Sequence, residues 1–100
     1  MKKSIDYQEY LLESLQNPEE AAGYLNAALE GGDIDVFLVA LKNVVKARGG
    51  IADLAIKAKK SRTSLYKTLS KNGNPYLQNT NDILHAMGMH LIVAPLEERY

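Results

Sequence analysis

The chain has 100 residues, 46% of them hydrophobic and 24% charged, which is the size and balance of one globular domain with a modest core. It contains no cysteine, which excludes disulfide bonds and thiolate metal sites. The N-terminal residues contain no apolar run long enough for a signal peptide or a membrane span. We therefore expect a cytoplasmic protein with no membrane partner.

The formal net charge is zero, but the charges are distributed unevenly along the chain. Residues 1–41 contain two basic and eight acidic residues, whereas residues 42–71 contain nine basic residues and one acidic residue. A basic segment inside a neutral chain is typical of proteins that bind a polyanion. A solvated surface that keeps the protein in solution would have the same composition, so charge alone leaves both interpretations open.

Two helices are predicted in the acidic segment. Tyr7, Leu11 and Leu15 are spaced four residues apart, as on one face of a helix. Asn17 is a good helix cap, and the proline and two glutamates that follow it suit the first turn of a helix. This second helix is expected to end at the glycine pair of residues 31–32.

Three helices are predicted in the middle of the chain. Asp33 is expected to cap the first, whose apolar residues repeat every three or four positions as far as the glycine pair 49–50. A helix of barely two turns begins at Ile51, and Ser61 is expected to cap the next.

The C-terminal residues predict one more helix and one strand. After a loop at residues 72–75, a helix is expected over residues 78–87, and residues 89–95 are apolar and β-branched as in a strand. A single strand needs a partner, so a second copy of the chain would supply it in a homodimer; the alternative is a short extended tail packed on its own domain. The predicted fold is an all-α bundle of about five to six helices with this short C-terminal strand.

Residues 51–69 form the most informative region. Two short helices joined by a tight turn must cross steeply, and the small residue Ala55 permits their close approach. Leu54, Ala58 and Leu65 would form their inner contact, which leaves polar and basic groups exposed at the start of the second helix. This pattern predicts a helix-turn-helix that binds DNA, although a purely structural helical hairpin with a solvated basic face has the same spacing.

The chain also carries a series of short motifs in a definite order. They are residues 9–12, 17–22, 24–30, 48–50, 54–55, 61–62, 65–66 and 73–75, and Gly88 with Leu91. This series resembles the addiction-module antidote proteins, a HigA-like family of bacterial antitoxins with a helix-turn-helix of the Xre/Cro, lambda-repressor-like type. The resemblance covers nearly the whole chain.

The resemblance implies an antitoxin that neutralises a RelE/ParE-like toxin and represses its own operon by binding double-stranded operator DNA as a dimer. It places the recognition helix at residues 61–70. The family usually has a glycine and then an apolar residue at the turn before this helix, where this chain has Lys59 and Lys60. Lys59 must therefore adopt a positive φ, or the turn must be reshaped. The predicted DNA contacts are Ser61, Arg62, Thr63, Ser64 and Tyr66, together with Lys60, Lys67 and Asn74.

The resulting prediction is a single domain of residues 1–100. It comprises acidic helices in residues 1–41, a DNA-binding core in residues 42–88 and a strand in residues 89–95 that contacts a second copy. The alternative is a protein-interaction module whose acidic half wraps a basic toxin without any binding of DNA. No spacing of histidines, serines or glycines indicates a metal site, a cofactor or an enzyme.

Overall fold

The computed structural model describes residues 3–70 and 74–97, the first four of these as backbone only. Within these ranges the chain forms six helices and no strand, which confirms the all-helical prediction. The helices are α1 (Lys3–Ser14), α2 (Pro18–Glu30), α3 (Ile34–Ala47), α4 (Gly50–Ala58), α5 (Arg62–Ser70) and α6 (Leu77–Ala86).

The predicted helix caps are confirmed. The side chain of Asn17 accepts hydrogen bonds from the backbone N–H groups of Glu19 and Glu20, at 2.8 and 3.1 Å. Asp33 caps α3 in the same way. The hydroxyl oxygen of Ser61 accepts a hydrogen bond from the backbone N–H of Ser64, in the first turn of α5, at 3.0 Å. These groups would otherwise be unsatisfied at the helix start, so three of the helix boundaries are fixed by local chemistry.

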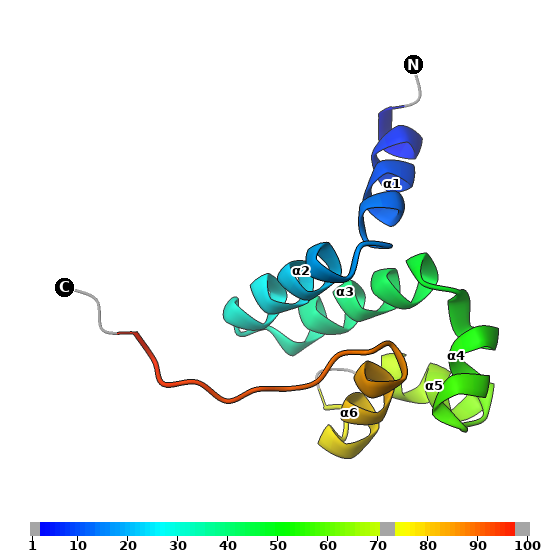
Figure 1. The fold of residues 1–100 in the computed structure, drawn as a ribbon, viewed down its shortest axis with the longest axis vertical. Coiled ribbons are helices and arrows are strands. Elements are labelled where there is room, and N and C mark those ends of the chain that lie inside the picture. The colour runs from blue at the N-terminus through cyan, green and yellow to red at the C-terminus, as the bar shows by residue number, and fades with distance from the viewer. Residues whose placement is uncertain (1–2, 71–73, 98–100) are drawn as a thin grey trace.

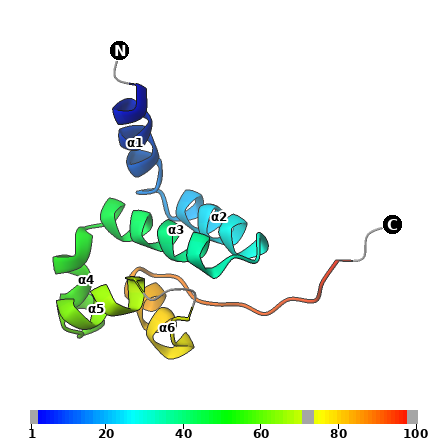
Figure 2. The same ribbon diagram turned by 180° about the vertical axis from the view of Figure 1, so that it is seen from behind.

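Helix α3 is the central element of the fold. It packs against α1, α2, α4 and α5, while α4 also packs against α5 and α6 (Figure 1). Seen from behind, α2 lies along one side of α3, whereas α4 follows the C-terminal end of α3 and α5 and α6 lie on the side away from α2 (Figure 2). The largest fully buried side chains come from all parts of this arrangement: Leu15, Leu41, Val44, Leu65 and Ile83.

The prediction of a C-terminal strand is wrong. Residues 89–97 leave the body as an extended segment with no strand pairing (Figures 1 and 2). Met89 packs against the core, but Val93 and Leu96 are 97% and 95% exposed. The β-branched composition does favour an extended backbone, but a strand also needs a neighbouring strand for its N–H and C=O groups. The described part of this chain offers none.

At the turn between α4 and α5, the first of the two alternatives holds: Lys59 adopts a positive φ. Lys59 has φ 57° and ψ 45°, in the left-handed region that usually favours glycine. The N–H of Lys60 donates to the carbonyl oxygen of Ala55 at 3.1 Å, and the N–H of Lys59 to that of Ile56 at 3.4 Å. This pair of bonds closes the end of α4 and offsets a backbone strain of roughly 1–2 kcal/mol at Lys59.

Candidate nucleic-acid interface

Helices α4 and α5 pack against each other, and the residues predicted for their inner contact are buried or partly buried in one core. Leu54 and Leu65 are 3% and 0% exposed, and the small side chains of Ala55 and Ala58 are partly buried against the same core. The tight turn and this inner contact hold α5 against the rest of the domain, with one face inward. The outward face of α5 is consequently fixed in position.

Most of the predicted DNA contacts lie on that outward face. Arg62 and Thr63 are exposed at the first turn of α5, Ser61 is exposed beside them, and Ser64 is partly buried. Tyr66 is 57% exposed, and Lys67 is exposed next to it. Arg62 and Lys67, the two basic residues of this helix, are exposed and form no ion pair with another described residue.

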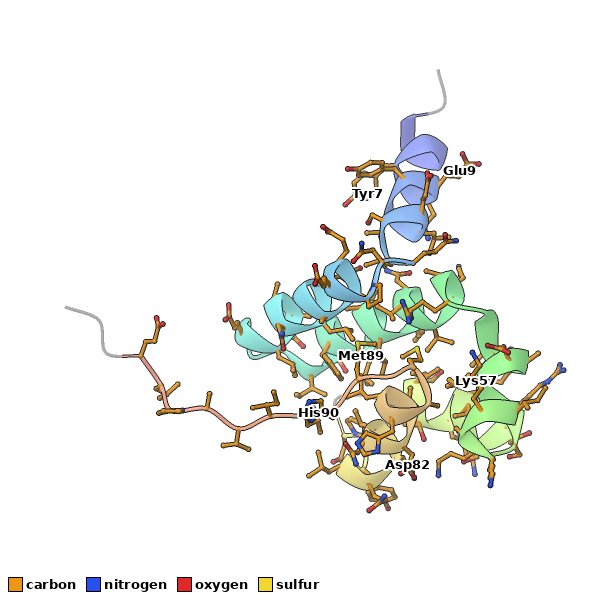
Figure 3. All side chains as sticks on the ribbon, in the orientation of Figure 1. Tyr7, Glu9, Lys57, Asp82, Met89 and His90 are labelled. Carbon is orange, nitrogen blue, oxygen red and sulfur yellow. The ribbon has the colours of Figure 1, made fainter. Side chains whose placement is uncertain are left out.

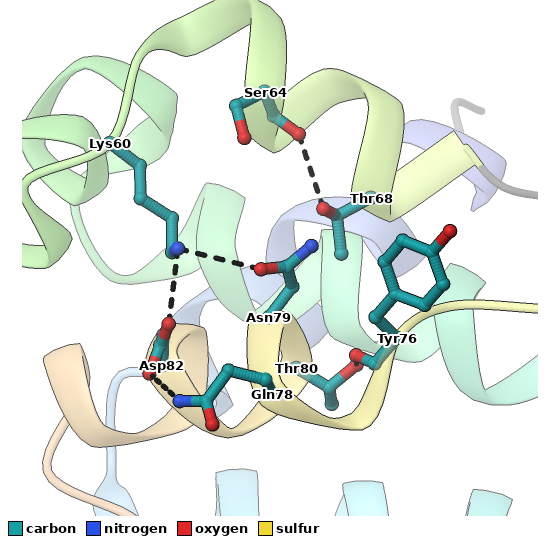
Figure 4. A network of polar contacts seen from close by, with 8 residues as sticks. All are labelled: Lys60, Ser64, Thr68, Tyr76, Gln78, Asn79, Thr80 and Asp82. Carbon is teal, nitrogen blue, oxygen red and sulfur yellow. Dashed lines mark hydrogen bonds and ion pairs between the residues drawn. The ribbon is translucent and has the colours of Figure 1, made fainter.

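Lys60 is placed differently from the other predicted contacts. Its ammonium lies 3.0 Å from a carboxylate oxygen of Asp82 and 3.5 Å from the amide oxygen of Asn79, both on α6 (Figure 4). Gln78 donates a further hydrogen bond to Asp82 at 2.9 Å. Lys60 therefore ties the turn before α5 to α6, which is a positioning role that sequence reasoning did not assign.

Asn74 is also separated from the α5 group. It is exposed at the approach to α6 and lines a hollow with Ile34 and Leu77, near the turn that joins α2 to α3. The structure thus groups Asn74 with a different part of the surface from Arg62 and Tyr66.

Two lysines that the predicted contacts omit border the outward face of α5. Lys42 and Lys46, one helical turn apart on α3, line a hollow of about 290 Å³ together with Ile51, Tyr66 and Ser70. The sequence could have indicated these two lysines by their position inside the basic segment, but only the packing of α5 on α3 places them beside Tyr66. They extend the positive surface from α5 onto α3.

The ion pair at Lys60 makes the stability of the domain depend on pH. The hydrogen bond from Lys60, and secondly that from Gln78, lower the pKa of Asp82 below its ordinary value of 3.8. A carboxylate with a lowered folded-state pKa contributes stability above its unfolded-state pKa and loses it as the pH falls through the folded-state pKa. We expect urea unfolding midpoints to fall more steeply below about pH 4 for the wild type than for Asp82→Asn. Parallel pH profiles of the two proteins would contradict this.

The described residues form neither a metal-binding cluster nor a membrane-spanning helix. No group of three or more histidine, aspartate or glutamate side chains in them is arranged to hold a metal ion. In the same ranges, no helix is long and apolar enough to span a membrane.

Three comparisons with known proteins bear on this arrangement. A family model described as "Probable addiction module antidote protein" matches residues 3–95. An uncharacterized protein of Haemophilus influenzae is 35% identical over 81 residues, which cover 81% of this chain and 82% of that protein. No solved structure matches the chain.

Proposed function

Because the chain belongs to the family of addiction module antidote proteins, we propose that it is the antitoxin of a type II toxin–antitoxin module and represses its own operon. An antidote implies a toxin partner. The resemblance to the HigA-like antitoxins favours a toxin of the RelE/ParE type and an antitoxin that acts in the cytoplasm as a homodimer on double-stranded operator DNA.

The observation that carries the DNA-binding part of this proposal is the outward face of α5. Arg62 and Thr63 are exposed at its first turn while Leu65 is fully buried behind them. In the proposed function α4 and α5 are a helix-turn-helix and α5 is the recognition helix, which enters a major groove by its N-terminal residues. Arg62 suits a bidentate contact to a guanine edge.

The flanking positive groups suit the phosphate backbone. Lys67 on α5 and the two lysines of α3 are exposed, and Ser61 lies at the N-terminus of α5, where backbone N–H groups favour an anion. Contacts of this kind hold the protein on the duplex without reading its sequence. A dimer would present two such helices to two half-sites about one helical turn of DNA apart.

Replacement of Arg62 by alanine tests the proposed recognition helix. We expect Arg62→Ala to weaken binding to a duplex from the region upstream of the gene by about 1–3 kcal/mol, roughly 5- to 150-fold, measured by fluorescence anisotropy. Lys57→Ala is the matched control, because it removes one positive charge whose ammonium already lies 2.9 Å from Asp53. An equal effect of both variants would contradict base recognition by Arg62.

The salt dependence of binding separates this function from the alternative. If Lys67 and the α3 lysines neutralise phosphates, affinity must fall linearly with added salt on logarithmic axes. The alternative, a protein-interaction module without DNA binding, is favoured by the withdrawal of Lys60 into its ion pair with Asp82 and by the strained lysine at the turn. It predicts no binding to the upstream duplex together with full binding of the toxin.

A further inference from the structure

Helices α1 and α2 enclose a surface hollow of about 440 Å³, here called the α1–α2 notch. Leu11 and Leu15 line it from α1 and the turn that follows, and Glu20, Gly23 and Tyr24 line it from α2. The wall formed by α2 is held in place, because the side-chain amide of Asn43 on α3 donates a hydrogen bond to the hydroxyl of Tyr24 at 2.9 Å.

Helix α1 extends the notch with an unpartnered aromatic side chain. The N-terminal half of α1 projects away from the body (Figure 1). Tyr7 lies one turn before Leu11 on the same helix face and projects to the side of α1 on which α2 lies, whereas Glu9 projects to the other side (Figure 3). Tyr7 is 65% exposed, so an apolar and aromatic surface that no described residue covers continues from the notch along α1.

Gly23 is the residue that the fold itself does not explain. It lies in the middle of α2, its φ is not positive, and a Cβ atom built on it meets no atom within 4 Å. Glycine is less favourable than alanine inside a helix, so the fold gains nothing from it here. A glycine on the wall of a hollow does allow another chain to approach the helix backbone closely.

The rim of the notch is acidic. Glu19 and Glu20 are both exposed there, and neither forms an ion pair with any described residue. Carboxylates beside tyrosine rings and leucines match an arginine or lysine that is flanked by apolar side chains. We propose that the α1–α2 notch binds a basic, partly apolar segment of the toxin protein. This inference rests on the proposed function, which supplies the toxin.

Two arginine substitutions on α2 test the notch. The probe is the protein encoded by the reading frame adjacent to the gene, and its affinity for the full chain is measured by isothermal titration calorimetry. Gly23→Arg adds bulk and positive charge to the notch at a position where a Cβ meets no other atom within 4 Å, and we expect it to weaken binding by about 30-fold or more, as at an interface hot spot. Asn26→Arg places the same side chain on a different face of α2, where it lines another hollow, and should leave the affinity unchanged.

A stability control and three contrary outcomes separate the notch from the proposed function. Gly23→Ala should be at least as resistant to heat as the wild type, which shows that position 23 tolerates a side chain. Equal affinities of Gly23→Arg and Asn26→Arg for the probe would overturn the notch as the binding surface and leave the proposed function intact. Failure of the wild type to bind the probe would overturn the toxin-binding part of the proposed function. Dissociation of a wild-type dimer by Gly23→Arg in sedimentation velocity would also overturn the inference, because the notch would then hold a second copy.

Discussion

Leu65→Ala is expected to lower the free energy of unfolding by about 2–5 kcal/mol, measured by urea denaturation. Leu65 has no exposed surface and lies where α5 packs against the core formed with α3 and α4. Removal of its three outer carbons leaves a cavity that the short helices around it can close only in part. The loss is a large fraction of the roughly 5–15 kcal/mol that stabilises a domain of this size.

Leu77→Ala is the matched control for this prediction. It removes the same atoms from a side chain that is 71% exposed, so we expect a change within about 0.5 kcal/mol. A loss of less than about 1 kcal/mol for Leu65→Ala would show that α5 is not held by this contact. The outward face of α5 would then lack the fixed position on which the proposed recognition of DNA depends.

The sequence predicts those parts of the fold that depend on neighbouring residues. Asn17, Asp33 and Ser61 each accept hydrogen bonds from N–H groups two or three residues further along the chain, so the start of each helix is encoded next to it. The prediction of a C-terminal strand fails because a strand depends on residues far away in the sequence. The β-branched residues of this segment favour an extended backbone, but a strand exists only if a distant segment pairs with it, and composition contains no information on that partner.

The same distinction applies to the candidate interface. The spacing of Leu65 and Leu69 already determines which face of α5 points outward, so the exposure of Arg62 and Tyr66 follows from a local pattern. The ion pair of Lys60 does not follow from a local pattern, because its partner Asp82 is 22 positions away in the sequence. The sequence shows a lysine at the turn but not that α6 withdraws its charge. The neighbourhood of the α3 lysines and Tyr66 likewise arises from packing alone.

Leu15→Ala is expected to lower the free energy of unfolding by about 2–5 kcal/mol and to loosen α1 in particular. Leu15 is 1% exposed, directly follows α1, and its N–H donates to the carbonyl oxygen of Leu11 at 3.0 Å. It is thus both a core residue and one wall of the α1–α2 notch. Hydrogen exchange should show the amides of α1 losing more protection than those of α3.

This prediction links stability to the proposed binding of the toxin. Without Leu15 the helix that carries Tyr7 loses its fixed angle to α2, so toxin affinity should fall at temperatures where the domain stays folded, while binding of DNA by α5 is retained. Leu96→Ala serves as the control, since that leucine is 95% exposed. If toxin binding and DNA binding fell together, the acidic and basic halves of the chain would act as one surface. Helices α1 and α5 lie on opposite sides of α3, which argues for two surfaces (Figure 1).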